Sequence, residues 1–207
     1  NGATGVPINT KVGATFSEAM DPTTITAATF TFTQGGVAVP GAVSYTGVSA
    51  VFTPAANLAV NTIYTATITT GAKDLAGNPL AANYVWRWTT GATTDTTAPT
   101  VTGTINANGA TGVPINTKVG ATFSEGMDPF TITTVTFTFK ETVSGAAVAG
   151  TISYSGVNAV FVPASNLTAN TNYTATITTG AKDLAGNPLA ANYVWSWTTS
   201  ATADTTA

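Results

Sequence analysis

The sequence predicts an all-β protein built from two tandem antiparallel β-sandwiches. Three observations support this prediction. A long sequence unit occurs twice, apolar and polar residues alternate with a period of two along short segments, and turn-forming residues separate those segments. Each unit has about 100 residues, which is a usual size for a domain with its own core.

The repeat sets the domain organisation of the 207-residue chain. The stretch NGATGVPINTKVGATFSE begins at Asn1 and returns at Asn108, 107 positions later. The stretch YTATITTGAKDLAGNPLAANYVW begins at Tyr64 and returns at Tyr173, 109 positions later. The second copy therefore carries two extra residues, near Glu141–Gly145. We expect the tip of a hairpin there, because insertions concentrate in surface loops.

The domain boundaries follow from this comparison. We assign residues 1–94 to the first repeat and 95–203 to the second, with the junction at 95–100. Residues 204–207 match 95–98 and predict the start of a further junction. The junction is too short for a long flexible linker and predicts an extended arrangement of the two domains with a small contact.

Both ends of the sequence resemble cuts through a continuing repeat. Residues 99–107 precede the second copy and are rich in β-branched residues, which predicts a first strand that the first copy lacks. No charged and apolar leader precedes Asn1, so we expect a mature or excised segment. The sequence favours a fragment of a longer array of repeats over a subunit that is completed by a strand from its neighbour.

The elements of the first copy follow in order from the alternation. Residues 11–18 place Val12, Ala14 and Phe16 on one face, and Asp21–Ala27 could form one short helical turn. Later segments repeat the same period of two at 29–33, 64–69 and 84–88, with Gly35-Gly36, Thr46-Gly47, Pro54, Gly71 and Gly77-Asn78-Pro79 as turn signals. About seven short strands in about 100 residues indicate an immunoglobulin-like sandwich.

A tyrosine begins one of these strands in each copy. Tyr64 lies six residues after Leu58, and Tyr173 repeats the arrangement after Leu167. This spacing is typical of a tyrosine corner, in which the phenol hydroxyl bonds to the upstream backbone. The alternative is that Tyr64 is only a core aromatic residue of a strand.

Several stretches together resemble the SbsA-type bacterial Ig-like domain. They are ATGVPINTKVGATFSEAMDP, a Phe/Thr strand, ANLAVNTIYTATI, KDLAGNPL, a last strand ending in WTTG, and the junction DTTAPTV. The resemblance implies an immunoglobulin-like sandwich repeated in secreted or surface proteins, among them S-layer proteins, adhesins, extracellular enzymes and some ice-binding proteins. It supplies no active site.

The composition limits the classes of function. Charged residues make up 7% of the chain, the net charge is −3, and the six Lys and Arg residues are scattered, so we expect neither nucleic-acid binding nor membrane insertion. The chain has no histidine and no cysteine, which removes the usual general base, the commonest metal ligand and any disulfide. No apolar run approaches the length of a membrane span.

The acidic residues of the first copy have two interpretations. Glu18, Asp21, Asp74 and Asp95 could contribute to a calcium site at the domain junction, but their spacing does not form a calcium loop. We favour turn and surface roles, with Asp74 in an Asx-type turn and Asp95 at an interdomain bend. Paired-carboxylate glycosidase chemistry would need a cleft that the sequence does not indicate.

The basic residues indicate no catalytic site. Lys11 and Lys73 are the only lysines of the first copy, and no base is available to activate a serine or threonine. Lys11 and Lys118 could form isopeptide bonds, although a solvated lysine at a strand edge is the favoured interpretation. Gly35-Gly36 lacks the framework of a phosphate-binding loop.

The remaining surface candidates are aromatic, hydroxyl and sequon residues. Trp86 and Trp88 share one face of a strand and are expected to fill the core rather than bind sugar. The threonine rows at 29–33 and 65–69 could order water, but a twisted sheet is a poor lattice for ice. Two N-glycosylation sequons begin at Asn166 and Asn172 and are a weak signal.

These observations favour a structural spacer, stalk or fibre-building element of an extracellular or cell-surface prokaryotic protein. The alternative is an adhesin-type module that recognises a glycan or another surface. The expected partners are further copies of the repeat, in the same chain or by strand donation, and glycan binding stays open. We predict no enzyme and assign no catalytic, cofactor-binding or metal-binding residue.

Overall fold

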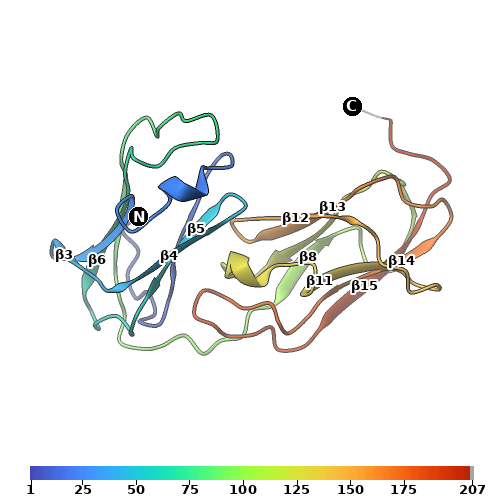
Figure 1. Ribbon diagram of the computed structural model, residues 1–207. Helices are drawn as coiled ribbons and strands as arrows, with labels where there is room; N and C mark the ends of the chain where they lie inside the picture. Colours follow the sequence, from blue (N-terminus) through green and yellow to red (C-terminus); the bar gives the residue numbers. More distant parts are fainter. Residues whose placement is uncertain (206–207) are drawn as a thin grey trace. The chain divides into compact units, whose positions relative to one another are not determined.

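The computed structural model describes residues 1–205 and consists of two compact units (Figure 1). Asn1–Thr97 makes up most of one unit, and Ala98–Asp183 with the segment from Pro188 on makes up the other. Each unit is a β-sandwich, so the predicted all-β fold with two tandem immunoglobulin-like domains is confirmed. The last two residues of the predicted junction at 204–207 lie outside the described residues.

The first domain has a three-stranded and a four-stranded sheet. The strands are β1 (Val12–Thr15), β2 (Phe30–Gln34), β3 (Val37–Ala38), β4 (Gly41–Thr46), β5 (Ser49–Pro54), β6 (Ile63–Ile68) and β7 (Tyr84–Thr89). Their order is β1-β5-β4 in one sheet and β3-β2-β6-β7 in the other.

The second domain has two four-stranded sheets. Its strands are β8 (Val101–Ile105), β9 (Ala110–Val113), β10 (Val119–Phe123), β11 (Phe137–Glu141), β12 (Gly150–Ser155), β13 (Asn158–Pro163), β14 (Asn172–Ile177) and β15 (Tyr193–Thr199). Their order is β12-β13-β10-β8 and β11-β14-β15-β9. The predicted strand at 99–107 is present as β8.

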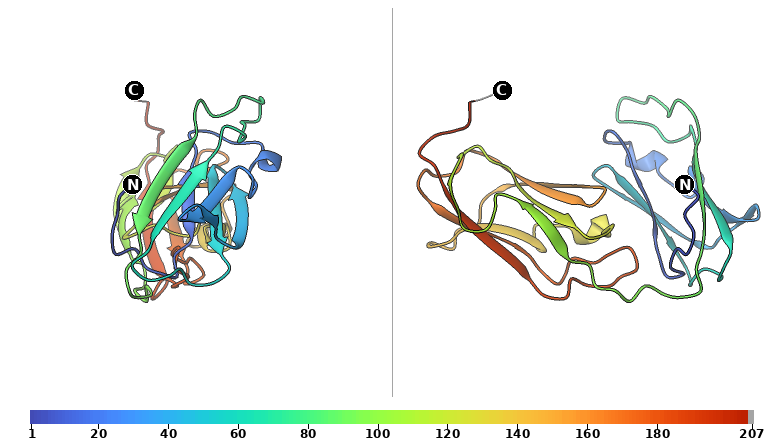
Figure 2. Two further views of the ribbon diagram at one scale, coloured as in Figure 1. Left: turned by 90° about the vertical axis from the view of Figure 1, so that its left-hand side faces the viewer. Right: turned by 180° about the vertical axis from the view of Figure 1, so that it is seen from behind.

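The core of each domain lies between its two sheets (Figure 2). In the first domain Phe30 and Phe32 alternate with threonines along β2, so both rings point inward and are buried. Both contact Phe52 of the opposite sheet, and Phe32 also stacks on Trp88 with centroids 5.4 Å apart. The period-two pattern therefore places the core residues as the sequence predicts.

One short 3₁₀ helix follows β1 in the first domain and its counterpart β10 in the second, η1 (Pro22–Thr24) and η2 (Pro129–Thr131). Asp21 caps η1, because its Oδ1 accepts hydrogen bonds from the backbone N–H of Thr23 at 2.9 Å and from the Thr23 hydroxyl at 2.7 Å. Proline at the first position fits the fixed φ of a helical start. The predicted helical turn at Asp21–Ala27 is thus present, shortened to one 3₁₀ turn.

The tyrosine corner is confirmed in both domains. The Tyr64 hydroxyl accepts a hydrogen bond from the backbone N–H of Ala59 at 2.8 Å. The Tyr173 hydroxyl accepts one from the N–H of Thr168 at 3.0 Å. Both tyrosines are buried, so the phenol oxygen satisfies an amide that the corner loop brings into the domain.

The two extra residues of the second copy lie in the predicted hairpin tip. In the first domain Gly35 and Gly36 form the turn after β2, both with positive φ, at +55° and +84°. In the second domain the turn after β11 extends to Gly145, and the backbone N–H of Gly145 donates to the carbonyl oxygen of Glu141 at 3.0 Å. The longer loop leaves the pairing of β11 with β14 in the register of β2 with β6, while the ladder between β2 and β3 is reduced to one isolated bridge, Lys140 with Ala147.

The pairing departs from a wholly antiparallel pattern at one place in each domain. β9 pairs with β15 in parallel, and an isolated parallel bridge joins Val6 and Thr90 in the first domain. Here the incoming chain runs beside the last strand of the sheet before it crosses to the other sheet. Among residues 1–205, no helix has the length and apolar character needed to cross a membrane.

Candidate functional site

Asp74 forms the predicted Asx-type turn. Its Oδ1 accepts hydrogen bonds from the backbone N–H groups of Ala76 and Asn78, both at 2.8 Å, and its Oδ2 accepts one from the Asn78 side chain at 2.7 Å. The Asn78 amide and the backbone donors favour the ionised form and lower the pKa of Asp74 below its ordinary value of 3.8. The Thr23 hydroxyl and N–H likewise lower the pKa of Asp21. Both carboxylates therefore have structural roles.

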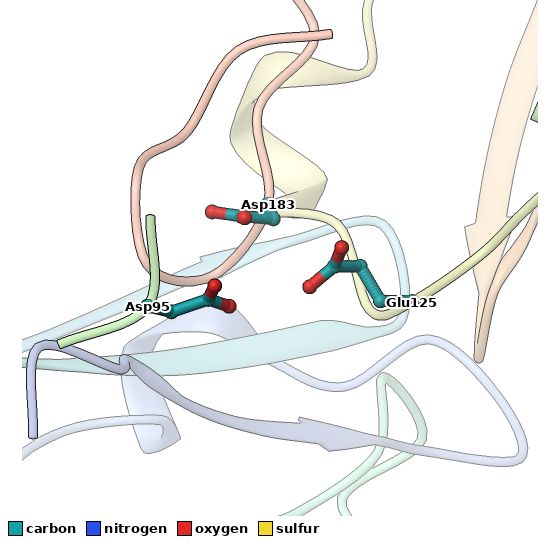
Figure 3. Close-up of side chains that lie close together, drawn as sticks. All are labelled: Asp95, Glu125 and Asp183. Carbon is teal, nitrogen blue, oxygen red and sulfur yellow. The ribbon is translucent and has the colours of Figure 1, made fainter. Parts of the chain in front are cut away.

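A second acidic arrangement lies in the second domain. The carboxylate oxygens of Glu125 and Asp183 lie within 4.8 Å of each other, although 58 positions separate the two residues (Figure 3). The spacing of the acidic residues in the sequence does not indicate this pair. Alignment of the copies matches it with Glu18 and Asp74. Two carboxylates offer fewer oxygens than the six to eight of a calcium ion, and we assign no metal site to the pair.

Asp95, also labelled in Figure 3, forms a turn of its own in the first domain. Its backbone N–H donates to Oδ1 of Asn9 at 2.8 Å, and the Asn9 side chain donates to the Asp95 carbonyl oxygen at 3.0 Å. Its Oδ1 accepts from the N–H of Thr97 at 2.9 Å. Asn116 and Asp204 repeat the reciprocal pair in the second domain. The pair fixes the end of each domain to its first loop.

The other candidates of the sequence lie on the surface. Lys118 is exposed and Lys11 is half-buried, each directly before a strand, so neither lies in the core of its domain. Thr65, Thr67 and Thr69 are half-exposed, as are Thr29, Thr31 and Thr33. Asn166 is exposed, whereas the Asn172 side chain donates to the Thr198 hydroxyl at 3.2 Å.

The tryptophans differ between the two domains. Trp88, Trp195 and Trp197 are buried, as the alternation predicts. Trp86, the counterpart of Trp195, is only half-buried. The expectation that both tryptophans of the first copy fill the core is thus met for Trp88 and only in part for Trp86, which packs against the core but is partly exposed. The Trp86 ring still lies on the inward face of β7. What differs between the two domains is how much of this ring other residues cover.

A groove explains this difference. It has a volume of about 700 Å³ and lies in the first domain, between the outer edge of β1 and the wall formed by β7. Phe16, Trp86 and Tyr84 are among its lining residues. The counterparts of Phe16 and Trp86 in the second domain, Phe123 and Trp195, are 2% and 1% exposed. No sequence motif indicated the shape of this groove.

Two repeated polar contacts were also missed. The Tyr45 hydroxyl accepts from the backbone N–H of Met20 at 2.7 Å, and Tyr154 repeats this bond with Met127. The buried Thr90 hydroxyl donates to the carbonyl oxygen of Ala59 at 2.6 Å and thereby ties the tyrosine-corner loop to the last strand. The duplication itself was the available signal, because each residue recurs in the other copy.

A family model described as the bacterial Ig-like domain matches residues 1–90 and again residues 95–199. The chain belongs to this family. The two matches of this bacterial Ig-like protein coincide with the two sandwiches described above. No curated protein gives a significant match to the sequence.

Similar solved structures include the N-terminal part of the bacterial S-layer protein SbsC. It is 15% identical, has a TM-score of 0.36, and is matched over 95% of this chain and 43% of that chain. The titin domains z1z2 in complex with telethonin are 9% identical with a TM-score of 0.33, over 99% of this chain and 93% of that chain. The Ig-like chain thus spans less than half of the S-layer chain.

Proposed function

We propose that the two Ig-like domains are structural spacer or fibre-building repeats of an extracellular or cell-surface prokaryotic protein. The observation that carries this proposal is the duplication of a sandwich domain. Each copy has its own aromatic core, its own tyrosine corner and its own reciprocal Asn–Asp pair at the end of the domain. Such repeats add length to a chain without adding a new chemistry.

The surface chemistry supports a structural rather than a catalytic role. The acidic side chains Asp21, Asp74 and Asp95 serve as caps and turns, and the chain contains neither histidine nor cysteine. Only six Lys and Arg residues are available to trypsin-like proteases, which suits a protein outside the cell. The motifs ATGVPINTKVGATFSEAMDP and KDLAGNPL also support assignment to the SbsA type within the family.

An adhesin-type module that recognises a glycan is the second candidate, and Trp86 is the observation that favours it. Its half-exposed ring lies in the groove of the first domain, and sugar rings stack on such faces. The spacer role predicts no glycan binding that depends on Trp86.

Single-molecule stretching of the chain tests the spacer role. We expect two separate unfolding events, each releasing roughly 300–350 Å of chain, as independent domains of about 100 residues would. A glycan array probed with the same chain is the second measurement. Specific glycan binding that Trp86→Ala removes, with both unfolding events intact, would replace the spacer role by the adhesin role.

A further inference from the structure

The second domain shows what covers its counterpart of the groove. β8 pairs antiparallel with β10, with Ile105 opposite Gly120, Thr104 opposite Ala121 and Gly103 opposite Thr122. The ladder continues beyond the strand, since the backbone N–H of Ser124 donates to the carbonyl oxygen of Thr100 at 2.9 Å. β8 is therefore the fourth strand of that sheet.

In the first domain the same sheet edge is open. β1 pairs with β5 along one edge, and among the described residues no strand pairs with β1 along the other. Residues Gly13, Ala14, Thr15 and Phe16 of this edge line the groove instead. They are the counterparts of Gly120–Phe123, so the groove has the sequence of a strand-binding surface and no strand on it.

The glycine of this edge shows which side chain a pairing strand places over it. A Cβ on Gly120 would lie 2.7 Å from Cδ1 and 3.0 Å from Cγ1 of Ile105, so the isoleucine, itself 43% exposed, packs over the glycine on the outer face of the sheet. A Cβ on Gly13 would meet no atom within 4 Å, and its φ is not positive. No contact within the first domain requires glycine at position 13. A pairing strand that places a branched apolar side chain over this position would require it.

We propose that the groove of the first domain is an acceptor site for an extended strand of the β8 type, supplied as an unpaired segment by another repeat of this kind. The strand lies antiparallel to β1 and completes a four-stranded sheet by β-augmentation. Its fifth residue is branched and apolar, to cover Gly13, and its third is small, to lie opposite Thr15. The first is apolar and lies near Phe16.

The β8 strand of a second copy of the chain is a poor donor. Its withdrawal would open an equal groove in its own domain, so the exchange would gain no net pairing. A segment outside a folded domain has no such cost. We therefore expect the chain alone to stay monomeric.

The second domain also shows how a donor can be connected. Only Asn106 and Ala107 separate β8 from Asn108, whose Oδ1 accepts from the N–H of Ser196 at 3.0 Å. Asn1 makes the same bond with Arg87 and lies beside the groove. A β8-type strand joined to Asn1 through two residues thus reaches β1 in the same register.

Tryptophan fluorescence can show whether a strand occupies the groove, because Trp86 is the one half-buried tryptophan and the other three are buried. The experiment adds a peptide of sequence APTVTGTINA, residues 98–107, to the full chain and follows tryptophan emission and acrylamide quenching. We expect a blue shift and reduced quenching, both absent in Trp86→Phe and with a peptide of scrambled order. Residues 99–107 joined ahead of Asn1 should give the same protection without added peptide.

Gly13→Val provides the decisive variant. The side chain enters open space in the chain alone, so the unfolding midpoint should stay unchanged, whereas peptide affinity should fall about tenfold or more because the valine occupies the place of the isoleucine. Ser44→Val adds the same side chain to exposed β4 of that sheet and should leave binding unchanged.

Three outcomes would overturn the proposal. Trp86 could stay equally quenched with both the peptide and the joined segment, or Gly13→Val could bind as well as the original chain. Alternatively, the chain alone could dimerise with Trp86 protected, which would identify a second copy as the donor.

Discussion

At the scale of single residues, buried hydroxyl groups determine how the loops attach to the sandwiches. Tyr64 and Thr90 both bond to Ala59, the first to its N–H and the second to its carbonyl oxygen. Tyr173 and Thr199 do the same to Thr168. Removing one hydroxyl leaves a partly buried backbone group without its partner, which costs more than the bond itself contributes.

We expect Tyr64→Phe to lower the free energy of unfolding of the first domain by about 1–3 kcal/mol, because core volume is kept and the Ala59 amide loses its acceptor. Urea denaturation followed by amide NMR signals of each domain measures this. Tyr84→Phe is the control, since Tyr84 is 62% exposed and should change the midpoint little. Equal midpoints for Tyr64→Phe and the original chain would show that the corner bond contributes nothing.

The Asx turn of Asp74 predicts a pH dependence. Its pKa is lowered in the folded domain, so its contribution to stability is present above its ordinary value of 3.8 and is lost as pH falls through the lower, folded-state pKa. Asp74→Asn should therefore destabilise the first domain at neutral pH and have a smaller effect in acid below pH 3.8. Urea midpoints from pH 2 to 7 test this, with exposed Glu18→Gln as control. A difference independent of pH would contradict it.

At the scale of elements, the two copies of one sheet differ by a strand. The sheet of β1, β5 and β4 has three strands, whereas the sheet of β10, β13 and β12 also contains β8. An added strand pairs backbone groups and covers apolar side chains, so it raises the cost of local opening.

Hydrogen exchange should show this difference directly. We expect amides of β1 to exchange faster than the amides at matching positions of β10, by about tenfold or more if β8 adds on the order of 1.4 kcal/mol to local stability. Amides of β6 and β14 are the internal control, because both strands lie between two neighbours. Equal protection of β1 and β10 would mean that the edge strand adds no stability.

The sequence predicts local elements well and their surroundings less well. The inward rings of Phe30 and Phe32 follow from alternation, and the bond of Tyr64 follows from its distance to Leu58. The partial exposure of Trp86 does not follow from alternation, because alternation gives the face on which a side chain lies and not the segments that cover that face. The proximity of Glu125 and Asp183 depends on two loops that are remote in sequence, and no spacing rule relates them.

At the scale of the whole molecule, the two cores are separate sets of residues. Every buried residue of one cluster comes from the first domain and every one of the other from the second. Changes in separate cores with no shared partners usually add.

We therefore expect the effects of Tyr64→Phe and Tyr173→Phe to add in the double variant, within about 0.5 kcal/mol. The same domain-resolved urea denaturation measures each domain in each variant. Each single change should leave the midpoint of the other domain unaltered. A shift of both domains by one change would reveal coupled unfolding and reject independent repeats.

The longer turn after β11 makes the second domain a natural host for inserted peptides. Two extra residues are accommodated there while Phe137 still pairs with Ile177, as Phe30 pairs with Ile68 in the shorter copy. Val143 at the tip is 89% exposed, so a foreign sequence placed beside it would project into solvent without entering the core. Epitopes or affinity tags inserted there should be accessible to an antibody in every folded molecule. The thermal midpoint of the domain should stay within a few degrees of the original.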